Sequence, residues 1–212
     1  THWHFDHAGG NETFAKAGAT IFASENVRKR LTNEIITTGR TAQPQPAPKA
    51  AWPVITFTAG VDFHLNGQTI RAINAPLPAH TDGDVFIYFV EADVFHTGDT
   101  YMKDRYPFVD TGSGGTQAGF IAALTRAIEV IGPNTKVIPG HGEVASRADV
   151  KKLRDQIADI RDQVVAALKK GKKVEDITAL GITDKYEAEL GKGFVKGKDF
   201  VLMMAENLKS GK

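Results

Sequence analysis

Three histidines and one aspartate stand within the first seven residues of this chain, at His2, His4, Asp6 and His7. Imidazole nitrogens and carboxylate oxygens are the protein ligands that suit zinc and similar divalent ions. A segment this short can supply only part of a metal site. A fold that uses it must therefore bring further ligands from distant parts of the chain. A metal site is favoured over a His-rich tag, because Asp6 and the glycine pair at 9–10 fit no tag.

The composition limits what such a site can contain. The 212 residues include no cysteine, so thiolate ligands and disulfides are excluded and any metal site consists of histidine and carboxylate side chains. With 42% hydrophobic and 24% charged residues, the sequence predicts a single globular domain over residues 1–212. The net charge of +1 gives no electrostatic reason to expect nucleic acid or an anionic membrane as a partner.

The apolar pattern predicts helices and strands in alternation, followed by a mainly helical C-terminal part. Helices are expected at 11–18, 24–36, 116–131, 147–170, 174–180 and 198–208, with Ser24 as the N-cap of the second. Strands are expected at 19–23, 54–57, 61–65, 68–73, 84–90, 94–96 and 136–138, and Asn66-Gly67 predicts a hairpin turn. The proline-rich segment 41–53 is expected to be an extended surface loop.

Three further candidate ligands stand at the ends of strand patterns, next to small residues. They are His80, Asp99 in a Gly-Asp pair, and His141 in Gly-His-Gly. Small neighbours such as Gly98 and Gly140 let the backbone turn tightly and let a metal ion approach closely. Each residue taken singly is typical of a turn or a cap, so the argument depends on all of them together.

In this order, the motifs resemble those of the metallo-β-lactamase superfamily. The similarity comprises Thr-His-x-His-x-Asp-His at 1–7, the isolated His80, the Gly-Asp at 98–99 and the Gly-His-Gly at 140–142. The stretch Arg-Tyr-Pro-Phe at 105–108, followed by Ser-Gly-Gly at 113–115, resembles a bacterial subgroup of lactamase-like hydrolases. The resemblance implies an α+β fold, the αββα sandwich, lacking its first N-terminal strands in this chain.

The resemblance also implies which residue binds which ion. One ion would be bound by His2, His4 and His80, the other by Asp6, His7 and His141, and Asp99 would bridge both. The implied cofactors are two Zn²⁺, since these nitrogen and oxygen ligands are about what two ions need when each keeps a position open. The implied reaction is attack of a metal-bridging hydroxide on the carbonyl of a small ester, thioester, lactone or lactam, with Asp6 as the catalytic residue that orients it.

Several alternatives stay open. A mononuclear iron oxidoreductase of the persulfide dioxygenase type shares much of the opening motif, so iron or a mixed Zn/Fe pair is the alternative metal content. A catalytically inactive metal-binding fragment is another interpretation. The absence of cysteine excludes the lactamase classes that place Cys on the second metal, and Asp99 favours the glyoxalase-II-like branch over a class that lacks a bridging aspartate.

The residues around these motifs carry weaker expectations. His96 precedes Asp99 closely and is a candidate for orienting a ligand without touching the metal. Trp3 and Phe5 alternate with ligands and are expected to pack beneath the site. Tyr106 and Ser113 lie in a glycine-rich loop, which either reaches a substrate or serves only as a connector.

The expected partner is a small-molecule substrate, with neither nucleic acid nor membrane. No apolar run is long enough to span a bilayer, and a periplasmic location is suspected only by analogy with relatives. Because the chain begins at Thr1, within a ligand cluster, residues upstream are expected to have been left out. Self-association or a separate N-terminal segment would then complete the fold, since an open sheet edge invites pairing.

Overall fold

The computed structural model describes residues 1–43 and 45–210, and within these the strands form two sheets. The smaller sheet pairs β1 (Phe22–Ser24) with β2 (Ile55–Phe57) in parallel. The larger contains, in spatial order, β3 (Val61–Leu65), β4 (Gln68–Asn74), β5 (Val85–Phe89), β6 (Val94–His96) and β7 (Lys136–Ile138). Neighbours in it are antiparallel except β6 and β7, which are parallel.

The turn between β3 and β4 follows from two residues. Asn66 and Gly67 have φ values of +53° and +72°, and two successive residues in the left-handed region are what a type I′ turn requires. The turn sets the pairing of Leu65 with Gln68 and of His64 with Thr69. The predicted hairpin is confirmed.

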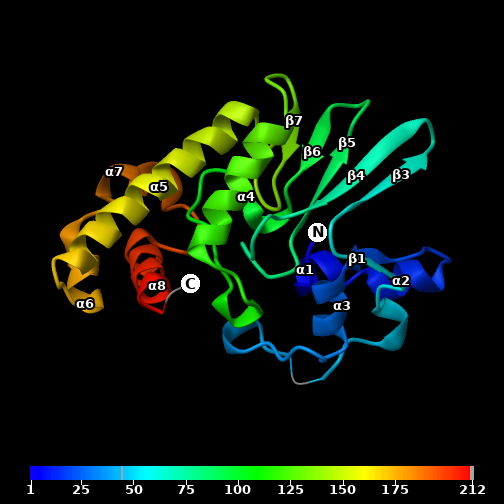
Figure 1. Ribbon diagram of the computed structural model, residues 1–212, viewed down its shortest axis with the longest axis horizontal. Helices are drawn as coiled ribbons and strands as arrows, with labels where there is room; N and C mark the ends of the chain where they lie inside the picture. Colours follow the sequence, from blue (N-terminus) through cyan, green and yellow to red (C-terminus); the bar gives the residue numbers. More distant parts are fainter. Residues whose placement is uncertain (44, 211–212) are drawn as a thin grey trace.

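Helices cover the outer faces of the two sheets (Figure 1). The N-terminal helices are α1 (Phe5–Ala8), α2 (Asn11–Lys16) and α3 (Glu25–Leu31), and α3 packs on β1 and β2. The helices α4 (Gln117–Val130) and α5 (Arg147–Lys169) lie on the far side of the larger sheet, and α6 (Val174–Ile177), α7 (Asp184–Leu190) and α8 (Gly197–Lys209) pack beyond them. None of the helices among the described residues has the length and apolar character needed to cross a bilayer.

Each face of the larger sheet has its own apolar contacts. Phe86 of β5 and Phe95 of β6 are fully buried in one cluster with Phe120 of α4, so this face packs against helices. On the opposite face, Phe63 of β3 meets Phe22 of β1, with ring centroids 4.7 Å apart in an edge-to-face arrangement. The order helix, sheet, sheet, helix is the expected αββα sandwich, and this prediction is confirmed.

Local predictions differ from the structure mainly near the N-terminus. The helix expected at 24–36 ends at Leu31, and Asn33 then adopts a φ of +60°. The Ser24 hydroxyl makes no cap but donates to the carbonyl of Gly83, because that loop packs against the helix start. Of the strand expected at 19–23, only residues 22 and 23 lie in β1 (Phe22–Ser24). Both α1 and α7 were missed because four- and seven-residue helices give little periodicity.

The described part of the proline-rich segment differs from the expected extended surface loop at residues 49–52. It contains a 3₁₀ turn at 49–51, and the indole of Trp52 donates a hydrogen bond to the carbonyl of Ala47. Ala51 is buried, so the prediction of an exposed, extended loop is wrong there; Pro44 lies outside the described residues.

Candidate metal centre

The candidate ligands meet at one edge of the larger sheet. Asp99 follows β6 and His141 follows β7, and because these neighbouring strands are parallel, their ends leave the sheet side by side. The amide of Gly140 donates to the carbonyl of Gly98 at 2.9 Å, joining the two loops. A Cβ atom at Gly140 would lie 1.9 Å from Oδ1 of Asp99, so only glycine fits beside this carboxylate.

His2, His4 and His80 form a first, buried group. Nδ1 of His4 lies 3.1 Å from Nε2 of His2 and 3.0 Å from Nε2 of His80. Each of these side chains belongs to a residue with less than a tenth of its surface exposed. The three nitrogens are close enough to share one ion.

Hydrogen bonds to the ring nitrogens that point away from the group fix the tautomers of His80 and His4. Nδ1 of His80 donates to the carbonyl of Phe108 at 2.6 Å, and Nε2 of His4 donates to Oδ2 of Asp110 at 2.9 Å. In their neutral forms the two rings therefore turn lone pairs, not protons, toward each other at 3.0 Å. Two lone pairs at this distance repel unless a cation lies between them, so the geometry fits a bound metal ion.

Asp6, His7, Asp99 and His141 form a second group beside the first. Nε2 of His141 lies 3.1 Å from Oδ2 of Asp6 and 3.3 Å from Oδ2 of Asp99. Nε2 of His7 lies 3.1 Å from Oδ1 of Asp99, yet both atoms are buried without a hydrogen bond among the described residues. Buried polar atoms seldom stay unpaired, so a cation at this point would satisfy both.

Asp99, a member of the second group, also lies close to the first. Besides its contacts with His7 and His141, its Oδ2 lies 3.6 Å from Nε2 of His80 and 4.0 Å from Nε2 of His2. Its carboxylate is therefore the side chain that lies near donor atoms of both groups.

The electrostatics of the two groups differ. Burial lowers the pKa of His2 and of His80, and neighbouring imidazoles lower that of His2 further, so both rings stay neutral as metal ligation requires. Burial also acts to lower the pKa of His7, but the carboxylates of Asp99 and Asp6 outweigh it and the pKa is raised. For Asp99 burial opposes ionisation, while His7 and the other imidazoles bring its pKa below the ordinary value.

Asp110 supports the first group from behind and was missed by the sequence analysis. Its carboxylate accepts hydrogen bonds from His4, Ser113 and Thr41. Burial alone would raise the pKa of Asp110, but these bonds lower it to about 2, so the group is ionised. The available signal was a carboxylate two residues after the Arg-Tyr-Pro-Phe stretch.

Replacing Asp110 with asparagine should weaken metal binding without removing any of the candidate ligands. The amide cannot match a carboxylate as acceptor for the His4 ring, so we expect zinc affinity to fall about 10- to 100-fold. Competition with a chromophoric chelator measures this. Asp104→Asn, an exposed position on the same loop where asparagine tolerates the φ of +55°, is the matched control. Equal affinities of the wild type and Asp110→Asn would contradict this role.

Other predicted site residues have mixed outcomes. Trp3 is buried beside Val27 and Leu31, as expected for packing beneath the site. Phe5 is 79% exposed, so the prediction that it packs there is wrong: helix α1 begins at Phe5 and ends the alternation on which that prediction rested. Nδ1 of His96 accepts a hydrogen bond from the amide of Gly98 at 2.9 Å, which fixes the turn before Asp99.

The glycine-rich loop does not place its hydroxyl groups at a surface. Tyr106 is buried and its hydroxyl donates to the carbonyl of Thr183, while Ser113 is buried against Asp110 and the Trp3 indole. Tyr106 and Ser113 therefore do not reach toward a substrate. At these two residues the loop serves as a connector, the second of the two interpretations.

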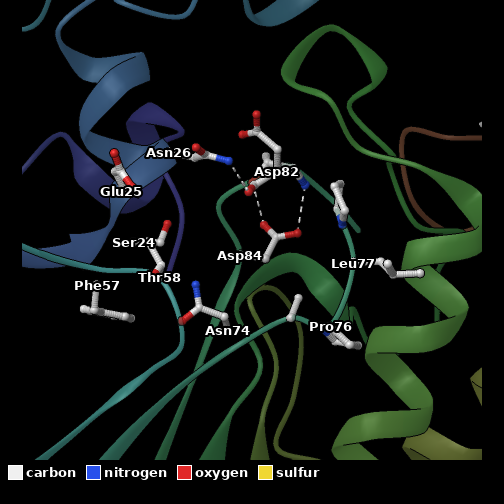
Figure 2. Close-up of a pocket in the computed structure, with 13 residues that line it drawn as sticks. Ser24, Glu25, Asn26, Phe57, Thr58, Asn74, Pro76, Leu77, Asp82 and Asp84 are labelled. Atoms are coloured by element: carbon white, nitrogen blue, oxygen red, sulfur yellow. Dashed lines mark hydrogen bonds between the residues drawn. The ribbon is translucent and has the colours of Figure 1, made fainter.

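A polar pocket of about 280 Å³ lies behind the loop that carries His80 (Figure 2). On its wall the Asp84 carboxylate accepts hydrogen bonds from the amide and the hydroxyl of Thr81, at 2.8 and 2.7 Å. Asp82 accepts a two-pronged ion pair from Arg30, at 2.7 and 2.6 Å. These bonds make Asp82 and Asp84 turn residues that hold the His80 loop.

The family model described as the metallo-beta-lactamase superfamily matches residues 1–160, about three quarters of the chain. This chain belongs to the metallo-β-lactamase superfamily. Superfamily members bind metal ions, and the two groups of His and Asp side chains are the candidate ligands in this member.

Solved structures share the fold at low sequence identity. A metallo-beta-lactamase family protein, TTHA1429 from Thermus thermophilus, is 20% identical with a TM-score of 0.65, covering 100% of this chain and 73% of that one. The sec-alkylsulfatase Pisa1 from Pseudomonas sp. is 17% identical with a TM-score of 0.70, and the match covers 97% of this chain and 40% of the alkylsulfatase chain. TTHA1623 in a di-iron-bound form is 22% identical with a TM-score of 0.53, covering 70% of each chain.

Proposed function

We propose that this protein is a hydrolase that binds two divalent metal ions and cleaves a small ester, thioester, lactone or lactam. The metal that we propose is zinc. The observation that carries the proposal is Asp99, which lies against both groups while its Oδ1 and the facing Nε2 of His7 are buried without a hydrogen-bond partner among the described residues. One ion would be held by His2, His4 and His80. The other would be held by Asp6, His7 and His141, and Asp99 would contribute to both. When bound, the pair of ions supplies Lewis acidity and lowers the pKa of bound water to about 7.

The two groups differ in their exposure to solvent, and this difference indicates the side from which a substrate would enter. The first group is buried, whereas the side chains of Asp6 and His141 in the second are 55% and 40% exposed. A substrate would therefore enter over Asp6 and His141. Asp6 is the carboxylate on the open side, so it is placed to accept a proton from attacking water and to orient it.

A paired measurement tests this function. Zinc-loaded protein should hydrolyse members of a panel of chromogenic esters, thioesters, lactones and cephalosporins; chelator should remove the activity and added zinc restore it. Asp6→Asn should lower turnover about 100-fold or more if this carboxylate handles the proton. Two bound zinc ions with no turnover of any carbonyl substrate would overturn the hydrolase in favour of an inactive metal-binding chain. One iron per chain would favour the mononuclear oxidoreductase.

A further inference from the structure

Arg40 sits over two aromatic rings beside the candidate metal centre. Its guanidinium carbon lies 4.9 Å from the ring centroid of Phe194 and 5.9 Å from that of Phe108. The two rings are 5.7 Å apart. Arg40 is exposed, as is Phe194 at 57%, so the cluster forms part of the surface.

Both ends of this cluster are connected to residues of the first histidine group. The Phe108 ring lies 6.0 Å from the His80 ring, and the Phe108 carbonyl accepts the hydrogen bond from His80 Nδ1. On the other side, Thr41 follows Arg40 in the chain and donates to Asp110, which accepts the hydrogen bond from His4. The neighbours of Arg40 in the chain and in space therefore also contact or orient two candidate ligands.

Arg40 differs from the other arginines in having no hydrogen-bond or ion-pair partner within the part of the chain that the structure describes. Of the nine arginines in the sequence, the other eight each donate to a carboxylate or a backbone carbonyl, in most cases within 3 Å; no such contact of Arg40 is found among the described residues. Its guanidinium lies over the Phe108 and Phe194 rings. A guanidinium on aromatic faces keeps its N–H edges free to bind a carboxylate in two-pronged fashion.

We propose that Arg40, with Phe108 and Phe194, is a substrate subsite that binds a carboxylate at the non-reacting end of the substrate, while the two rings contact its apolar part. This inference rests on the proposed hydrolase function for the identity of the bond cleaved, but the binding of the anion does not depend on catalysis. The subsite narrows the substrate class from small carbonyl compounds to acidic ones.

Turnover of two matched esters tests the subsite. The nitrophenyl half-ester of glutaric acid carries a free carboxylate, and nitrophenyl valerate is its neutral counterpart of similar length. Arg40→Ala should lower kcat/KM for the acidic ester about 10- to 100-fold, mainly through KM, and change the neutral ester less than about twofold. Arg40→Lys should recover part of the loss. Arg126→Ala, an exposed arginine on α4, is the matched control.

A binding experiment separates the subsite from the catalytic proposal. Phenylacetate, followed by NMR saturation transfer on zinc-free protein, should bind to the wild type and lose its signal in Arg40→Ala, whereas phenylacetamide should bind neither. Equal phenylacetate signals in both proteins, or equal losses of turnover for both esters, would overturn the subsite. Arg40-dependent binding of phenylacetate, without turnover of any carbonyl substrate in the panel, would support the subsite and overturn the hydrolase.

Discussion

Asp99→Asn should lower kcat/KM about a thousandfold or more and reduce the zinc content from about two ions per chain to about one or less. The reason is geometric, because Asp99 lies within 4.0 Å of a nitrogen in His2, His7, His80 and His141. Asparagine keeps the size of the side chain but removes the charge that would offset two cations. Elemental analysis and hydrolysis rates on the same preparation measure both effects.

The control for this variant removes an exposed carboxylate that is far from the candidate ligands in the sequence. Asp62 pairs with Arg71 on the exposed face of the β3–β4 hairpin, so Asp62→Asn should change neither zinc content nor rate. An Asp99→Asn protein that keeps both ions and more than about a tenth of the wild-type rate would show that the carboxylate does not bridge.

Removal of the metal should lower the thermal midpoint Tm by about 5 to 10 °C. Ions present at about 100 times their dissociation constant stabilise the native state by about 2.7 kcal/mol, and for a chain of this size 1 kcal/mol shifts Tm by about 2 to 4 °C. Without ions, the lone pairs of His4 and His80 face each other at 3.0 Å. His7 and Asp99 then each have a buried polar atom with no hydrogen-bond partner in the described ranges 1–43 and 45–210. Calorimetry with and without chelator measures the shift.

The Tm prediction has an internal control. Chelator already saturated with zinc should leave Tm unchanged, and Asp99→Asn should respond to free chelator less than the wild type. An unchanged wild-type Tm after the metal has been shown by elemental analysis to be removed would contradict structural coupling between the ions and the fold.

The sequence predicted the parts of this fold that depend on local patterns or on motifs. Asn66-Gly67 determined a hairpin because its backbone preference is intrinsic, and the resemblance in motif order predicted the αββα layers. Short helices such as α1 were missed because four residues show no period, and with α1 the exposure of Phe5 was missed as well.

The site was predictable in its donors but not in its supporting contacts. The motifs gave each candidate ligand, and the structure brings these side chains together in two groups. Asp110 carries only its position two residues after the Arg-Tyr-Pro-Phe stretch as a signal, and Arg40 carries none. Their roles come from contacts between residues far apart in the chain, such as those of Asp110 with Thr41 and of Arg40 with Phe194. Tertiary contacts of this kind follow from the fold and cannot be derived from residue type or spacing alone.

Metal stoichiometry together with metal position tests the proposed centre. The protein would be purified without added ions, analysed for elements, and crystallised for anomalous diffraction at the zinc edge. The centre described above predicts about two ions per chain, one among His2, His4 and His80 and one among Asp6, His7 and His141, both touching Asp99. Anomalous peaks elsewhere, or a fully zinc-equilibrated protein with no ion between these side chains, would contradict it.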